Sequence, residues 1–288
     1  MRRWLAIFTP CLALFLASGC SSLLFYPTRS LYYDPAQMRL SFEEIHFKSG
    51  DGTPLYGWYF HHKDAKRKTK ALIVFSHGNS LNISGQFGNL VFVLDRDYDY
   101  FIFDWRGFGS SGGDGRPTPA EGVADTIAAL RWSDGRAKHD GVPLIAFGQS
   151  LGSALLVRAL IEEKATIHPK LVVLDSTFIS FEWASASVLA QHGLTTPLQP
   201  FAFLLVSDEW APGNRIRELS PTPLLFFHGT ADRVIRPELG EAAYAAALPP
   251  KEFVPVPGAG HIQAFWGEER EKYRDLLFTR MDAAVGSE

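Results

Sequence analysis

The sequence predicts an α/β protein with a mostly parallel, eight-stranded sheet, an antiparallel hairpin at its start and helices on both faces. From residue 71 onward, short apolar runs of strand length alternate with segments of helix-forming residues. This alternation is typical of a parallel sheet that helices cover on both sides. Two earlier segments, 42–48 and 55–60, alternate apolar and polar residues around a Ser-Gly-Asp-Gly turn, which indicates the hairpin. The length of 288 residues suits one large domain.

The other elements are expected in alternating order along the chain. The helix at 119–133 has the clearest start, because Thr118 and Glu121 form a capping box around Pro119. Residues 178–217 are apolar and contain several prolines, so we expect short helices there, forming a small cap on a domain of residues 42–283. Further strands are expected at 71–76, 100–103, 143–147, 171–174, 224–227 and 252–256, and further helices at 83–94, 151–163, 238–248 and from about 268.

The first residues have the pattern of a lipoprotein signal peptide. Met1-Arg2-Arg3 supplies positive charge, an apolar run covers residues 4–17, and small residues follow. This run is shorter than the about 20 residues that a membrane span needs. Residues 17–20 (Ala-Ser-Gly-Cys) resemble a bacterial lipobox, in which the cysteine becomes the lipidated first residue of the mature protein. We expect a signal peptide at 1–19 and an anchor and lead-in at 20–41, with an uncleaved signal anchor as the alternative.

A lipidated Cys20 predicts a protein that is anchored to a membrane of the bacterial cell envelope. The chain contains only Cys11 and Cys20, and cleavage would remove Cys11, so no intrachain disulfide is expected. Several acyl chains hold a protein stably on a membrane, whereas one chain holds it only marginally. By resemblance to Gram-negative lipoproteins, Ser21 after the cysteine favours the outer membrane, facing the periplasm. The mature protein is expected to be a monomer.

Charge and motif spacing exclude several classes of protein. The net charge of −3 leaves no basic excess to neutralise phosphates, which argues against a nucleic-acid partner. The dense basic run at 63–70 falls between two predicted strands and is interpreted as a solvated loop. The glycines at 107, 109, 112 and 113 lack the strand–GxGxxG–helix context of a nucleotide site, and no HExxH spacing occurs. We therefore expect no metal and no cofactor.

A candidate nucleophile lies in the stretch Gly148-Gln149-Ser150-Leu151-Gly152. This G-x-S-x-G pattern follows an apolar strand and opens a helix. In that context the serine occupies a sharp, strained turn with its hydroxyl exposed. Gly148 and Gly152 are expected because a Cβ at either position would crowd the neighbouring strand or helix. A serine is a weak nucleophile by itself, so Ser150 needs a base, and the base needs an acid that orients it.

Asp232 and His261 are the candidates for the acid and the base. Asp232 ends the motif His-Gly-Thr-Ala-Asp directly after one apolar strand, and His261 ends Gly-Ala-Gly-His after the last strand. Parallel strands present their ligand site at their carboxyl ends, so these side chains are expected to meet near Ser150. Asp175 also follows a strand and remains an alternative acid. His228 is expected to be a buried turn residue rather than the base.

Together these motifs resemble the single-domain α/β-hydrolases, and within them a bacterial branch described as lysophospholipase-like or serine-aminopeptidase-like. The resemblance covers nearly all of the mature chain, to about Arg280. The branch more often has arginine where Gln149 stands and glycine where Ser153 stands. Such motifs specify the fold and a Ser-His-Asp triad more closely than a substrate. The matching motifs are His77-Gly78-Asn79, Asp104-Trp105-Arg106-Gly107-Phe108-Gly109-Ser110, Gly148–Gly152, His228–Asp232 and Gly260-His261.

The resemblance implies acyl transfer through a covalent acyl-enzyme. His261 would take the proton of Ser150, Asp232 would hold the imidazole, and the amides of Leu151 and Asn79 would bind the oxyanion. Asp104 and Arg106 are expected to fix the loop beside the site.

The expected substrate is an acyl ester, for example a lysophospholipid or a similar lipid ester. The apolar segment 178–206 either lines an acyl pocket or serves only for packing. A serine peptidase of the aminopeptidase-like type is the alternative activity. A catalytically silent lipoprotein that binds a partner in the envelope is the alternative from another class.

Overall fold

The computed structural model describes residues 21–64, 66–191 and 193–286, and its centre is an eight-stranded sheet. The strand order is β10-β9-β8-β7-β4-β6-β3-β2. Neighbours from β10 to β6 are parallel, and β3 and β2 are added as an antiparallel hairpin. The predicted fold class is thereby confirmed. The strands are β2 Phe42–Lys48, β3 Pro54–Phe60, β4 Ala71–Ser76, β6 Tyr98–Asp104, β7 Leu144–Gln149, β8 Leu171–Asp175, β9 Leu224–Gly229 and β10 Lys251–Val256.

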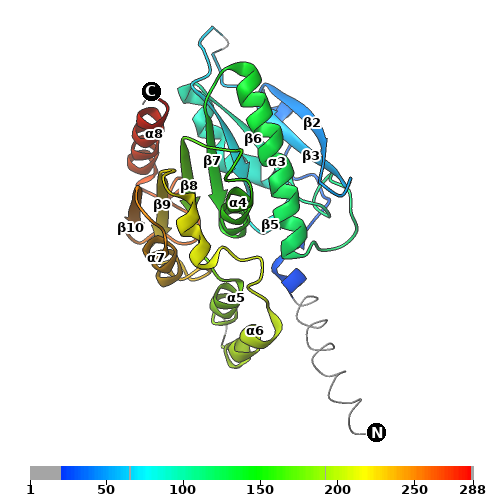
Figure 1. Ribbon diagram of the computed structural model, residues 1–288, viewed down its shortest axis with the longest axis vertical. Helices are drawn as coiled ribbons and strands as arrows, with labels where there is room; N and C mark the ends of the chain where they lie inside the picture. Colours follow the sequence, from blue (N-terminus) through cyan, green and yellow to red (C-terminus); the bar gives the residue numbers. More distant parts are fainter. Residues whose placement is uncertain (1–20, 65, 192, 287–288) are drawn as a thin grey trace.

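Helices cover both faces of this sheet (Figure 1). One face packs against α3, α4 and α7, whose apolar side chains meet alternate residues of the strands. The other face packs against α8 and the helical segment that follows β4. The central strands β4 and β7 are buried at every residue because both of their faces are covered. These helices are α3 Pro119–Asp140, α4 Leu151–Glu162, α7 Pro237–Ala246 and α8 Arg270–Gly286.

Two helices differ from the sequence-based expectation. The segment predicted as one helix at 83–94 is a single α-helical turn, α2 Ile83–Gln86, followed by the 3-10 helix η3 Phe87–Arg96. Gly85 and Gly88 lie in this stretch, and glycine is a poor former of α-helix interiors. Helix α3 has the predicted capping box but extends to Asp140, where Gly141 adopts a left-handed conformation with φ 67° and ends it.

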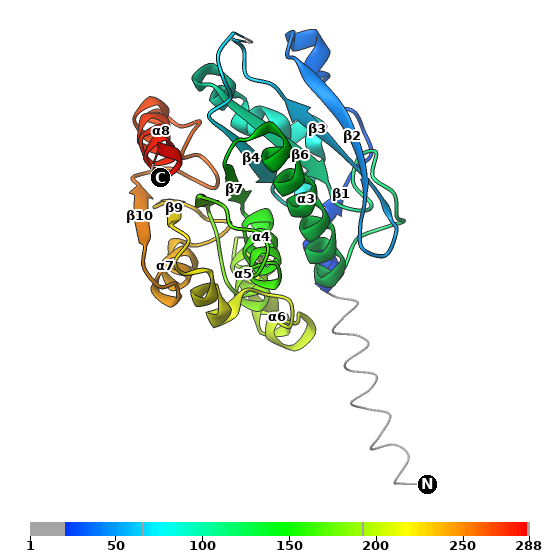
Figure 2. The same ribbon diagram turned by 45° about the horizontal axis from the view of Figure 1, so that its top comes forward.

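Residues 178–217 contain the short helices that were expected there. Figures 1 and 2 both place α5 and α6 side by side at one end of the molecule. Helix α5 follows the carboxyl end of β8, so this end is the one at which the parallel strands finish. None of the helices in the described ranges is long and apolar enough to cross a membrane. The elements are α5 Phe181–Leu189, η4 Thr196–Leu198, α6 Gln199–Leu205 and η5 Gly213–Leu219.

The lead-in, residues 21–41 as described by the structure, begins at this end of the sheet and runs to the opposite end, where Phe42 of β2 pairs with Phe60. Phe25 is fully buried and meets the Trp105 ring edge-on, with the ring centroids 6.1 Å apart. The guanidinium of Arg29 donates hydrogen bonds to three carbonyls of the loop after β6. The predicted signal peptide at 1–19 and the predicted lipidation site Cys20 lie outside the described residues. The lead-in contains η1 Ser22–Leu24, η2 Pro35–Met38 and β1 Tyr26–Pro27, which pairs in parallel with β5 Ser80–Leu81.

Candidate active site

Ser150 occupies a sharp turn between β7 and α4. Its backbone has φ 52° and ψ −125°, a strained conformation for a residue with a side chain. The Ser150 amide donates to the carbonyl oxygen of Asp175 over 2.9 Å, which ties the turn to the end of β8. A Cβ on Gly148 would collide with the backbone of Ser153, and one on Gly152 with the carbonyl oxygens of Ser76 and His77. The two glycines therefore allow α4 to begin directly against the neighbouring strands.

The structure joins Ser150, His261 and Asp232 by two hydrogen bonds. His261 Nε2 lies 2.9 Å from Ser150 Oγ, and His261 Nδ1 lies 2.8 Å from Asp232 Oδ2. The three residues come from the start of α4, the loop after β10 and the loop after β9. The carboxylate side chain of Asp232 is fully buried, whereas the His261 side chain is 18% exposed. This arrangement can move a proton from the serine hydroxyl to a histidine that a buried carboxylate orients.

Asp232 is held in place by its own loop. Its Oδ1 accepts hydrogen bonds from the amides of Val234 (2.9 Å) and Ile235 (3.0 Å), which leaves Oδ2 for His261. Burial raises the pKa of the Asp232 carboxyl, but the hydrogen bond and charge of His261 and the Ile235 amide outweigh it. The pKa consequently lies below its ordinary value, and the carboxyl is ionised.

Asp175, the alternative acid, faces a different partner. Its Oδ2 accepts a 2.9 Å hydrogen bond from the Gln149 side chain, while Oδ1 has no hydrogen-bond partner among the described residues. Burial raises the pKa of Asp175 to about 6, with the Gln149 hydrogen bond opposing the shift. The histidine Nδ1 bonds to Asp232 and not to Asp175.

His228 lies in strand β9 and not in a turn, although it is buried as expected. Its Nε2 donates to the carbonyl oxygen of Ile235 over 2.8 Å, so this nitrogen carries the proton. Gly240 of α7 packs against Nδ1 so closely that a Cβ there would collide with the ring. Burial lowers the pKa of His228 and keeps the ring neutral. His228 therefore supports the loop that carries Asp232.

The loop after β4 lies beside the serine, as expected for an oxyanion-binding loop. A Cβ on Gly78 would be 4.0 Å from Cβ of Ser150. The Asn79 side chain accepts a 3.0 Å hydrogen bond from the Tyr26 amide, which joins the loop to the lead-in. Among the described residues, no backbone group accepts a hydrogen bond from the amide of Asn79 or of Leu151. Both N–H groups are thus unpaired within the backbone beside Ser150.

Buried polar groups fix the base of this loop. His77 Nδ1 donates to the Gly78 carbonyl oxygen over 2.7 Å, and its ring centroid lies 4.4 Å from that of Trp105. Burial lowers the pKa of His77 to about 4. Asp104 accepts a 2.9 Å hydrogen bond from the Ile83 amide, and burial raises the pKa of its carboxyl to about 8. Asp104 therefore supports the adjacent loop, as expected, through its hydrogen bond with the backbone amide of Ile83.

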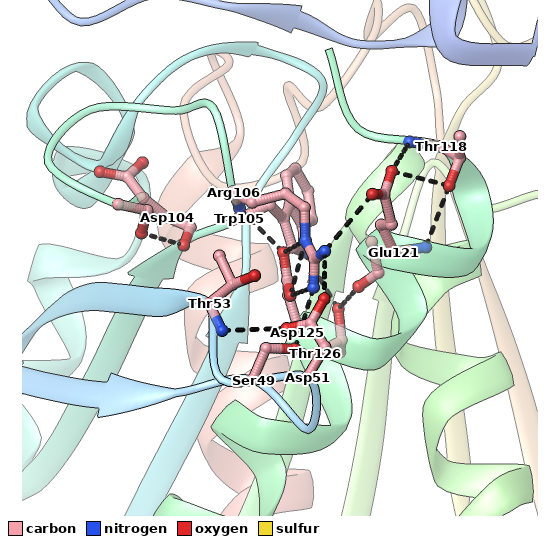
Figure 3. A network of polar contacts seen from close by, with 12 residues as sticks. Ser49, Asp51, Thr53, Asp104, Trp105, Arg106, Thr118, Glu121, Asp125 and Thr126 are labelled. Atoms are coloured by element: carbon pink, nitrogen blue, oxygen red, sulfur yellow. Dashed lines mark hydrogen bonds and ion pairs between the residues drawn. The ribbon is translucent and has the colours of Figure 1, made fainter. Parts of the chain in front are cut away.

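Arg106, in the loop after β6, forms a separate network of polar contacts (Figure 3). Its guanidinium bonds the buried carboxylate of Asp125 in α3 and reaches Asp51 in the β2–β3 turn at 2.7 Å. Glu121 and Ser49 complete the network. This fits the expected supporting role, but Asp125 was not among the residues expected from the sequence. The signal that could have identified this residue is a carboxylate on the buried face of α3, because a buried charge needs a partner.

Ser176 is another positioning residue that was not expected from the sequence. It follows Asp175 with φ 54°, and its hydroxyl accepts a 3.1 Å hydrogen bond from the amide of Ile262. Because Ile262 is adjacent to His261, this contact fixes the histidine loop. A lone serine after a strand carries no pattern that distinguishes it.

In the described part of the chain, no group of three or more His, Cys, Asp and Glu side chains is arranged to hold a metal ion.

Comparisons with known proteins agree with this architecture. The family model described as "Serine aminopeptidase, S33" matches residues 67–207. The uncharacterized protein YfhR of Escherichia coli O157:H7 is 31% identical over 258 residues, which are 89% of this chain and 85% of that protein. The alpha/beta hydrolase domain-containing protein WAV2 of Arabidopsis thaliana is 27% identical over 248 residues, covering 83% and 78%. The solved structure of the Pyrococcus furiosus esterase Pf2001 has a TM-score of 0.67 at 18% identity, covering 90% and 96%.

The sheet order, the serine turn and these likenesses define an α/β hydrolase. The identity shared with YfhR extends over most of both chains. The chain therefore belongs to the α/β-hydrolase family, and YfhR is one of its relatives. The predicted α/β-hydrolase family and fold are thereby confirmed.

Proposed function

We propose that the protein is a serine hydrolase that cleaves an acyl ester through Ser150, His261 and Asp232. The observation that supports this proposal is the continuous pair of hydrogen bonds, 2.9 Å between Ser150 and His261 and 2.8 Å between His261 and Asp232. A serine hydroxyl is a weak nucleophile, and a base within hydrogen-bond reach activates it.

In the proposed reaction, Ser150 Oγ attacks the ester carbonyl carbon while His261 Nε2 takes the hydroxyl proton. Asp232 keeps Nδ1 protonated and stabilises the imidazolium. The carbonyl oxygen becomes an oxyanion and accepts hydrogen bonds from the amides of Leu151 and Asn79. His261 then gives the proton to the leaving alcohol, which leaves an acyl group on Ser150. Water, activated by His261, attacks this acyl-enzyme, and the proton returns to Ser150 as the acid departs.

The substrate is proposed to be a lipid-like acyl ester such as a lysophospholipid. Residues 183–207 contain no Asp, Glu, Lys or Arg, and helix α5 in this segment bonds the loop that carries Asp232, from Ser187 Oγ to the Val234 carbonyl at 2.8 Å. A charge-free surface beside the site suits an acyl chain better than the charged amino terminus of a peptide. A serine aminopeptidase is the second candidate, which the description of the matching family model favours.

We also propose that Cys20 is lipidated and holds the enzyme on the bacterial outer membrane, facing the periplasm. The charged start, the apolar run at 4–17 and the lipobox-like residues 17–20 support this proposal.

A fluorophosphonate probe tests the catalytic proposal. Such probes react with activated serines, so the wild type is expected to be labelled and Ser150→Ala is not. Ser110→Ala is the matched control, because Ser110 is an exposed serine on a neighbouring loop and its loss should leave labelling unchanged. A folded wild type without label would instead support the catalytically silent lipoprotein. A panel of acyl esters and peptide amides then separates the two activities: cleavage confined to amides would refute the ester proposal.

A further inference from the structure

Helices α5 and α6 expose an unusual number of large apolar side chains. Of the seven described residues of α6, only Ala202 is buried. Trp183 of α5 is 52% exposed although its ring packs edge-on against Phe203, with centroids 4.8 Å apart. Large apolar side chains that are exposed close to one another mark a binding surface more often than scattered ones do. We name this surface the apolar face, and it is formed by Trp183, Leu194, Leu198, Phe201, Phe203 and Leu204.

The apolar face lies beside the candidate active site. Ser187 of α5 accepts a 3.3 Å hydrogen bond from the Arg236 amide, on the loop that also carries Asp232. On the other side of Ser150, the lead-in exposes Leu31 and Tyr33, and its Tyr26 amide bonds Asn79 of the loop after β4. The carboxyl edge of the sheet is therefore flanked by exposed apolar residues on both sides.

The chain enters the described structure next to the same helices. Ser21 Oγ accepts a 3.1 Å hydrogen bond from the amide of Ser207, two residues after the end of α6. Cys20 is covalently bonded to Ser21, and consecutive Cα atoms are about 3.8 Å apart. Acyl chains attached to Cys20 would thus extend from the protein at a point beside the apolar face.

The charges of this edge favour a lipid surface over a protein partner. Residues 183–207 carry no Asp, Glu, Lys or Arg, which suits contact with acyl chains because a charged side chain is costly there. Aromatic side chains such as Trp183 and Tyr33 favour the boundary between headgroups and acyl chains. The exposed Arg233 and Arg236 lie on the adjacent loop and would face anionic headgroups.

We propose that the apolar face is a membrane-contacting surface that holds the catalytic edge of the sheet against a lipid bilayer. This inference rests on the proposed anchoring at Cys20. Contact at this face would let an ester whose acyl chain lies in the bilayer reach Ser150 without passing through water. The shallow insertion of an interfacial helix, about 5–10 Å, fits two short helices that cannot span.

Quenching of tryptophan fluorescence by brominated lipids tests the contact directly. Full-length protein is reconstituted in vesicles of phosphatidylcholine and phosphatidylglycerol, with and without brominated acyl chains. The emission that disappears in Trp183→Phe is expected to be quenched at least twofold by the brominated lipid. Trp132→Phe is the control, because Trp132 is partly buried against Phe101 and its emission should not be quenched. Unquenched Trp183 emission would overturn the proposal. The apolar face would then be covered by something other than lipid, such as a second copy of the protein or residues 1–20.

A second pair of variants tests the consequence for turnover. Leu194→Ser combined with Leu204→Ser is expected to lower hydrolysis of a vesicle-borne ester at least fivefold and to leave a soluble short-chain ester unaffected. Leu248→Ser, an equally simple change at the opposite edge before β10, should alter neither rate. An equal loss on both substrates would contradict the proposal. Quenching without any hydrolysis would refute the proposed activity alone, whereas membrane association lost in Cys20→Ala without Trp183 quenching would refute the surface alone.

Discussion

At the scale of single residues, two buried carboxylates lie near the carboxyl ends of neighbouring strands, Asp175 at the end of β8 and Asp232 in the loop after β9. Asp232 is ionised because the hydrogen bond and charge of His261 and the Ile235 amide outweigh its burial. The Asp175 carboxyl accepts a hydrogen bond from the Gln149 side chain, and burial raises its pKa to about 6. An acid that stabilises an imidazolium must be ionised and must contact the ring. Asp232 meets both conditions.

Matched substitutions of the two carboxylates distinguish their roles. Asp232→Asn is expected to lower kcat by about 10⁴-fold, since the wrong histidine tautomer is then held. Asp175→Asn keeps the size of the side chain and should lower kcat by less than about tenfold, because His261 Nδ1 bonds to Asp232 and not to Asp175. The measurement is kcat for a soluble acyl ester, with circular dichroism as the control for folding. A larger loss in Asp175→Asn would reassign the acid.

The buried carboxyl of Asp104 predicts a pH-dependent stability. Burial raises its pKa from 3.8 to about 8, so between these values the folded protein holds a proton that the unfolded chain has released. The free energy of unfolding therefore falls as the pH rises through this window, by about 1.4 kcal/mol for each pH unit. Asp104→Asn keeps the oxygen that accepts from Ile83 but cannot ionise. Urea unfolding at about pH 5 and pH 8 should show a smaller fall for the variant; equal falls would contradict the prediction.

At the scale of elements, the β7–α4 turn was predictable because its constraints are local. The G-x-S-x-G pattern states which positions tolerate no Cβ, and the structure supplies the atoms that would collide. The capping box of α3 was predictable for the same reason. The segment after β4 was not, since it combines an apolar helical pattern with Gly85 and Gly88. This segment packs against the sheet mostly as a 3-10 helix, which helix propensity alone does not predict.

Two glycine substitutions measure the local constraint. Gly152→Ala places a methyl group against the carbonyls of Ser76 and His77 and is expected to destabilise the protein by about 1–3 kcal/mol. Gly135→Ala lies within α3 with open space around the new methyl group, so it should stabilise by about 0.5–1 kcal/mol. Thermal unfolding of both variants checks the signs, and a neutral Gly152→Ala would show that α4 shifts freely.

At the scale of the whole molecule, the catalytic edge, α5, α6 and the first described residues lie at one end (Figure 2). A chain anchored there would present its active site to the membrane. This orientation depends on contacts between distant segments, such as Ser21 with Ser207 and Tyr26 with Asn79.

Substitution of the two cysteines tests the anchor. Cys20→Ala is expected to move the protein from the membrane fraction to the soluble fraction, because lipidation is lost. Cys11→Ala lies in the apolar run and should leave the membrane fraction unchanged. Fractionation followed by immunoblotting checks both outcomes. Retention of Cys20→Ala on membranes would support an uncleaved signal anchor instead.

The sequence by itself determined the fold class, the turn at Ser150 and the candidate residues Asp232 and His261, because these depend on local patterns and on strand ends. It left Asp175 as an alternative partner of His261, since both carboxylates follow apolar runs that are predicted as strands. Only the tertiary structure decided that contact, through the loop amides that orient Asp232. It also decided that α5 and α6 turn their apolar side chains outward, because exposure depends on the neighbours that folding provides or withholds.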